Sequence, residues 1–196
     1  LPASGWKGHN ILGIVAPTVE AATQTPWAVT APQYPQKYNT DLIAVFGTTR
    51  TITSYAYPEE IKKRCPKVTV VQQICADLAG AIEDARPEAE LDTLVKAGVD
   101  GLMAQTGGHP PHRAILGCTH FPLVEHLFRR HLPPFTRMLP QPDVVADSLE
   151  DYFQRHAHYL AAANAAPILL TTADPGHVSR VARIFWPQAP AFTHLG

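Results

Sequence analysis

Residues 114–123 read AILGCTHFPL, a stretch that joins a short apolar run to a polar turn and a proline. The apolar run predicts a buried strand over Ala114–Leu116, Gly117 allows a close backbone approach, and Pro122 predicts the start of a helix. Cys118 lies between the two elements. The stretch therefore predicts a strand–turn–helix unit with a thiol in the turn.

The same alternation of apolar runs and stretches of helical period continues along the chain. We expect strands at 11–15, 42–46, 68–74, 114–116 and 167–170. We expect helices at 18–23, 52–64 with a break at Pro58, 88–103, 122–131, 148–163 and from 174 onward, and a surface loop over 24–40. Continuous apolar strands between helices are typical of an α/β fold with a parallel, doubly wound sheet.

Three of these strands run into small polar residues at 47–49, 117–120 and 171–172. In doubly wound sheets, ligands bind beyond the carboxyl ends of the strands. We therefore expect the functional site along this edge. Thr48 and Thr51 fit a turn that faces a ligand, although threonines in such turns also serve as helix caps.

Composition excludes several classes of protein. The 196 residues are 45% hydrophobic with a formal net charge of -1, which argues against disorder, and scattered Lys and Arg argue against a nucleic-acid surface. No apolar run approaches the roughly 18 residues of a membrane span and no signal pattern opens the chain, so we expect a cytoplasmic protein. Three cysteines without metal-type spacing argue against a disulfide framework and a zinc site.

Cys118 has the strongest chemical signal of the three cysteines. A helix N-terminus stabilises an anion by about 0.3–1 kcal/mol, or roughly one pKa unit at most, so His120 is the local group that would assist further. We expect a lowered pKa for Cys118 and preferential alkylation. The alternative is a buried structural cysteine. His109 and His112 suggest either a metal site or plain surface residues.

The stretch 114–123 resembles the second cysteine motif of glutamate racemases, in which tyrosine is common where Phe121 stands. Four other segments match that family in the same order: 13–19, 47–52, 144–148 and 171–175. The resemblance implies two pseudo-symmetric α/β lobes with the active site between them, no cofactor such as pyridoxal phosphate, and one catalytic cysteine from each lobe. The motifs of the first lobe do not occur here, so we expect the C-terminal two-thirds of such a protein.

The resemblance also implies roles and boundaries. It makes Cys118 and His120 catalytic, and it assigns substrate contacts to Thr119, His120, Thr48 and Thr51. Glu83 would support the histidine, with a solvated carboxylate as the alternative, and Cys75 would be structural. The fold would be one doubly wound lobe with remnants of a second, similar lobe. We expect residues 1–40 to hold a strand, a short helix and a proline-rich loop, 41–147 the α/β lobe with Cys118, and 148–196 a C-terminal segment that packs toward the other lobe.

The implied function is interconversion of L- and D-glutamate by two thiols, supplying D-glutamate for peptidoglycan. Glutamate would be the small-molecule partner, without nucleic acid or membrane, and a homodimer is a further expectation. Three alternatives stay open: another racemase of the superfamily for aspartate or hydantoins, a single-cysteine decarboxylase, and a non-catalytic binding module.

Overall fold

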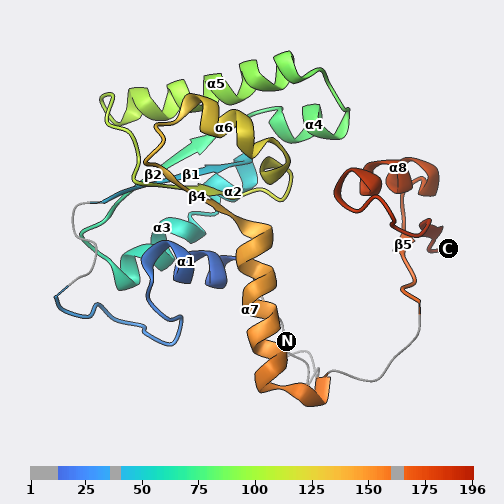
Figure 1. The fold of residues 1–196 in the computed structure, drawn as a ribbon, viewed down its shortest axis with the longest axis horizontal. Helices are drawn as coiled ribbons and strands as arrows, with labels where there is room; N and C mark the ends of the chain where they lie inside the picture. The colour runs from blue at the N-terminus through green and yellow to red at the C-terminus, as the bar shows by residue number, and fades with distance from the viewer. Residues whose placement is uncertain (1–12, 36–40, 160–165) are drawn as a thin grey trace.

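The computed structural model describes residues 13–35, 41–159 and 166–196 (Figure 1). Its main sheet has four parallel strands in the order β2-β1-β3-β4. The strands are β1 (Leu42–Gly47), β2 (Thr69–Ile74), β3 (Arg113–Leu116) and β4 (Arg137–Pro140). This sheet confirms the predicted α/β class.

Helices connect these strands and continue beyond the sheet. They are α1 (Val15–Thr23), α2 (Thr49–Thr53), α3 (Ala56–Arg64), α4 (Leu78–Glu83), α5 (Glu88–Gln105), η2 (Phe121–Val124), α6 (Glu125–His131), α7 (Gln141–Arg155), η3 (Ala157–Tyr159) and α8 (Pro175–Phe185). A separate two-stranded parallel sheet pairs β5 (Leu170–Thr171) with β6 (Thr193–His194).

Strand β1 is the centre of the core, and all six of its residues are buried. Ala44 and Phe46 pack with the residues of α4, α5 and α6, whereas Ile43 and Val45 pack with those of α1 and α3. Figure 1 shows these two helical layers above and below the sheet. Burial of each large apolar side chain contributes about 1.5–3 kcal/mol, so this packing fixes the position of the carboxyl end of β1.

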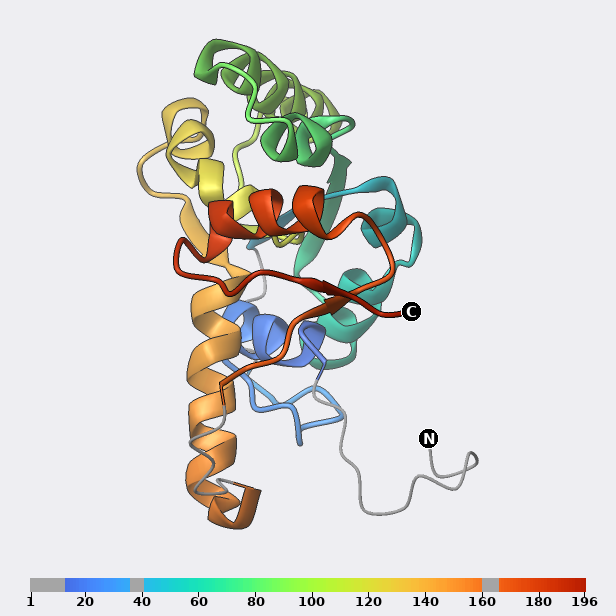
Figure 2. The ribbon, with the colours of Figure 1, turned by 90° about the vertical axis from the view of Figure 1, so that its right-hand side faces the viewer.

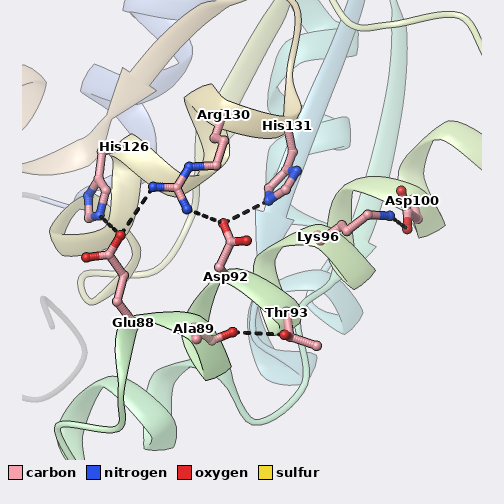
Figure 3. Close-up of polar contacts among 9 residues, drawn as sticks. All are labelled: Glu88, Ala89, Asp92, Thr93, Lys96, Asp100, His126, Arg130 and His131. Atoms are coloured by element: carbon pink, nitrogen blue, oxygen red, sulfur yellow. Dashed lines mark hydrogen bonds and ion pairs between the residues drawn. The ribbon is translucent and has the colours of Figure 1, made fainter.

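A cluster of charged side chains joins α5 to α6 (Figure 3). Arg130 donates to Asp92 at 3.0 Å and to Glu88 at 3.2 Å, and His131 Nε2 lies 2.9 Å from Asp92 Oδ1. The hydrogen bond from His131, together with the charges of His131 and Arg130, lowers the pKa of Asp92. The cluster holds α6, which follows the Cys118 turn, against α5.

The strand predicted at 11–15 is wrong for its described residues, because Val15 is the first residue of α1. Residues 11 and 12 lie outside the described ranges. A short apolar run does not distinguish a strand from a buried helix by its periodicity. Pro17 falls in the first turn of α1, where its missing N–H costs no hydrogen bond. The described part of the predicted loop, 24–35, contains no helix or strand.

The break predicted at Pro58 lies instead between α2 and α3. Tyr55 adopts a left-handed conformation with φ of 58°, which no continuous helix tolerates. Pro58 is the third residue of α3 and needs no hydrogen-bond partner there.

The C-terminal third also differs from its prediction. The helix expected at 148–163 begins earlier, since Val144, Val145 and Ala146 already belong to α7, and it ends at Arg155; residues 160–163 lie outside the described ranges. The strand expected at 167–170 is reduced to β5, while β4 and α4 were not predicted.

The last helix was predicted correctly. Asp174 caps α8 by accepting a hydrogen bond from His177 N at 2.6 Å, and Pro175 is the first residue of the helix. Figure 1 shows α8 and β5 standing beside the sheet, and Figure 2 shows α8 from its own side with the sheet and its helices behind.

Candidate active site

The strand order places a topological switch point between β1 and β3. From β1 the chain moves outward to β2 on one side, and β3 then lies on the other side. Phe46 pairs with Leu116, so the residues that follow the two strands, Thr48 after β1 and 117–118 after β3, leave the sheet at the same edge. Ligands of open α/β sheets bind at such points. The geometry therefore supports the edge that carries Cys118 as the candidate site.

Gly117 determines how the chain leaves β3. Its N–H donates to the carbonyl of Phe46 at 2.8 Å. A Cβ at this position would lie 3.1 Å from that carbonyl oxygen and 3.4 Å from the Tyr57 ring. A larger residue would have to push β1 away, so glycine allows Cys118 to follow immediately beyond the sheet.

Cys118 lies at one end of a short chain of polar side chains. Its Sγ is 3.6 Å from His120 Nδ1, and His120 Nε2 is 2.6 Å from Glu83 Oε1 at the end of α4. If Glu83 accepts the Nε2 proton, Nδ1 of a neutral imidazole is left as a proton acceptor facing the thiol. Thr119 Oγ1 is a second neighbour of Nδ1, at 3.4 Å. The arrangement can move a proton between the thiol and the imidazole.

The prediction of a lowered pKa for Cys118 is wrong. Burial raises the pKa of this thiol, and the negative charge of Glu83 raises it further. Hydrogen bonds from the backbone N–H groups of His120 and Phe121 lower it, but by less than burial raises it. The helix that was expected to help does not begin at the turn, since the 3-10 turn η2 intervenes and α6 starts only at Glu125. The dipole effect falls off within one turn.

The two threonines after β1 share the candidate edge. Thr48 caps α2 by accepting from Thr51 N at 3.4 Å, and the two hydroxyl oxygens are 3.2 Å apart. The interpretation of Thr48 as a helix cap is thus confirmed. Both side chains are only half-buried, and their contact with a substrate stays a prediction.

One residue of the site was not anticipated. The ring of Phe185, the last residue of α8, packs against the His120 ring with centroids 5.1 Å apart and planes at 86°. The only signal in the sequence was the apolar face of the last helix, which does not reveal what that face contacts.

The other cysteines and the paired histidines have structural environments. Cys65 and Cys75 are buried, each 4% exposed, and burial raises the pKa of Cys75 to about 12. His112 Nδ1 accepts a hydrogen bond from Leu42 N at 3.0 Å, and His109 Nδ1 lies 3.0 Å from the carbonyl of Thr106. Both histidines are exposed, and among the described residues neither belongs to a group of three side chains that could hold a metal ion.

Comparison with curated proteins identifies relatives along most of the chain, although no family model matches it. It is 40% identical over 181 residues to a glutamate racemase of Phenylobacterium zucineum, covering 92% of this chain and 64% of that protein. It is 37% identical over 194 residues to a glutamate racemase of Jannaschia sp., covering 98% of this chain and 69% of that protein. The chain thus spans slightly less than two thirds of the first of these relatives.

Solved structures show the same fold. A glutamate racemase of Bacillus anthracis superposes with a TM-score of 0.75 at 21% identity, covering 100% of this chain and 68% of that one. A glutamate racemase of Francisella tularensis in complex with D-glutamate superposes with a TM-score of 0.72 at 18% identity, covering 97% of this chain and 64% of that one. Among the described helices, none has the length and apolar character needed to cross a membrane. The identity and coverage of the curated relatives establish that this chain belongs to the glutamate racemase family.

Proposed function

We propose that this chain supplies one of the two acid/base groups of a cofactor-independent glutamate racemase, and that Cys118 is that group. The observation that carries the proposal is the half-buried thiol at the switch point, 3.6 Å from His120, which is itself paired with Glu83. The Francisella tularensis relative of the same fold binds D-glutamate, which supports glutamate as the ligand.

The chemistry is a proton exchange at the α-carbon. The Cys118 thiolate takes the α-proton, an S–H bond forms as the C–H bond breaks, and the electron pair is left on the α-carbon next to the carboxylate. A second acid then delivers a proton to the opposite face. In the reverse direction Cys118 is the acid. Exchange on both faces requires two such groups, one on each side of the substrate.

The raised pKa of Cys118 makes a proton acceptor for its thiol necessary. His120 Nδ1 is the nearest such group, and Glu83 stabilises the imidazolium that forms when the proton arrives. Thr48, Thr51 and Thr119 would bind the substrate carboxylates or ammonium group through their hydroxyls. We assign them this role because they line the same edge as the thiol.

The second acid/base group would come from a facing lobe. We propose that residues 41–147 form the lobe with Cys118 and that residues 148–196 pack toward the other lobe. Several large apolar side chains of this last segment are exposed, and a facing lobe would cover them. They are Ile168, Leu170, Ile184, Phe185, Trp186 and Leu195.

A chimaera tests the proposal. The part of the Phenylobacterium zucineum relative that this chain does not span is joined to residues 1–196, and the interconversion of L- and D-glutamate is followed by circular dichroism. We expect turnover in the chimaera, its loss by several orders of magnitude in Cys118→Ser, and its retention in Cys65→Ala. Turnover in Cys118→Ser equal to that of the parent would refute the assignment.

Two further proposals concern the setting of the reaction. The product D-glutamate would be used for peptidoglycan synthesis, which places the enzyme in the cytoplasm. Glutamate would be its small-molecule partner and a second copy of the protein its partner in a homodimer, which analytical ultracentrifugation of the chimaera would detect.

A further inference from the structure

The imidazole of His120 is contacted from three directions by three separate parts of the chain. Glu83, at the end of α4, lies at Nε2, and Cys118, in the same turn as the histidine, lies at Nδ1. Phe185, at the end of α8, packs on the ring in a T-shaped arrangement. The first two contacts belong to the proposed proton path, whereas the third comes from an element with no part in it.

The polar contacts, which include Thr119 Oγ1 at 3.4 Å from Nδ1, do not fix the orientation of the ring by themselves. The ring can turn over about its bond to Cβ, which replaces each nitrogen by a carbon. An aromatic neighbour at a right angle resists this turn, because an edge-to-face contact depends on which atoms of one ring meet the other ring. The side chain of His120 is 19% exposed, so water has some access to it.

We propose that Phe185 is a positioning residue that holds the His120 imidazole in the one orientation in which Nε2 faces Glu83 and Nδ1 faces Cys118. The inference rests on the proposed role of His120 beside the thiol. It also implies that His120 is ordered only while α8 keeps its position, because α8 contacts the imidazole through Phe185.

Phe185 lies outside the buried core of the chain, with 42% of the residue exposed, and its ring contacts His120. The neighbouring Ile184 has nearly the same exposure, 38%, and provides a matched control on the same turn of α8.

The test measures the tautomer of the His120 imidazole directly in the 196-residue chain. Histidine labelled with ¹⁵N shows, by long-range proton–nitrogen correlation, which ring nitrogen carries the proton. This readout does not depend on the ring current that is lost with Phe185. In the parent protein, at a pH at which the imidazole is neutral, we expect one tautomer, protonated at Nε2. Phe185→Ala and Phe185→Leu should populate both tautomers, whereas Phe185→Tyr and Ile184→Ala should retain the single one.

The leucine variant keeps apolar bulk at the end of α8, so it serves if the alanine variant fails to fold, which the backbone amide spectrum reports. A single Nε2-protonated tautomer in every folded variant would overturn the inference. The outcome is independent of the assignment of Cys118 as a base. If Cys118→Ser retains turnover in the chimaera while Phe185→Ala still mixes the tautomers, the proposed function fails and the positioning role stands.

Discussion

Cys118 is subject to opposing influences, and burial is the strongest of them. Desolvation and the nearby Glu83 charge favour the thiol, while two backbone N–H groups favour the thiolate. The net result is a raised pKa, so at neutral pH the residue carries its proton, which His120 removes in the proposed mechanism. The relative reactivity of the three thiols toward small reagents should then depend on their exposure to solvent rather than on their acidity, because Cys65 and Cys75 are buried more completely than Cys118.

We therefore expect iodoacetamide to alkylate Cys118 before Cys65 and Cys75 in the folded chain. The pH midpoint of its alkylation should lie above that of a free cysteine, because the thiolate is the reactive form and its pKa is raised. Peptide mass spectrometry after timed labelling between neutral and alkaline pH measures both quantities. Faster labelling of Cys65 or Cys75 would contradict the expected order of alkylation. A midpoint for Cys118 below that of free cysteine would contradict the raised pKa.

A charge substitution separates the contribution of Glu83. Glu83→Gln removes a negative charge that raises the pKa of Cys118, so the alkylation midpoint should move to lower pH. Asp84→Asn is the matched control, since Asp84 is the adjacent carboxylate and pairs with Arg86 instead. An equal shift in both variants would show that the effect is not specific to the charge of Glu83.

At the scale of elements, the predictions that succeeded rest on patterns within a single segment. Helix α5 was predicted from its apolar face and β1 from its apolar run, and both are observed close to the expected bounds. The Cys118 turn could be read because its glycine, cysteine and proline are contiguous. The contact of Glu83 with His120 could be assigned only by resemblance, because it joins α4 to a turn far along the chain. Phe185 had no local signal at all.

Helix α5 packs through a glycine on Cys75, the residue that follows β2, and this contact yields a stability prediction. A Cβ at Gly98 would lie 2.8 Å from Cys75 Sγ, closer than a real contact allows. Gly98→Ala should destabilise the fold by about 1–3 kcal/mol, as overpacked core substitutions do. Gly80→Ala is the control, because a Cβ there meets nothing within 4 Å and should stabilise α4 by about 0.5–1 kcal/mol. Urea unfolding measures both, and an unchanged midpoint in Gly98→Ala would contradict the packing.

The charged cluster between α5 and α6 yields a prediction on pH. The pKa of Asp92 is lowered in the folded state, so its contribution to stability is complete above the ordinary pKa of 3.8 and is lost as the pH falls through the folded value. Asp92→Asn should therefore lower the free energy of unfolding at pH 7 but not at a pH below the folded-state pKa of Asp92. Asp100→Asn, which affects only an exposed pair with Lys96, is the control. Equal effects of Asp92→Asn at both pH values would contradict this account.

At the scale of the whole molecule, the sequence predicted the parallel sheet but not how the C-terminal segment meets the edge that carries Cys118. The packing of α8 against His120 depends on a segment that leaves the sheet through α7 and returns, and no periodicity encodes such a path. The acidity of Cys118 was misjudged for a similar reason. It depends on burial by distant residues and on a 3-10 turn that the position of proline did not distinguish from an α-helix.

A polypeptide of these 196 residues alone should not racemise glutamate at a useful rate. Racemisation needs an acid/base group on each face of the α-carbon, and of the three thiols only Cys118 is accessible. Polarimetry on a preparation whose intact mass confirms 196 residues checks this expectation. Sustained turnover by such a preparation would show that the second group lies within the chain.

The central claim, that Cys118 is the base for one enantiomer, is tested most directly by washout of the α-hydrogen in D2O. In the chimaera, proton NMR follows L- and D-glutamate separately. The parent should exchange both. Cys118→Ser should bind glutamate, lose exchange for the enantiomer whose α-hydrogen faces residue 118, and retain it for the other at the opposite group. Washout from both enantiomers at the parent's rate in Cys118→Ser would contradict the account.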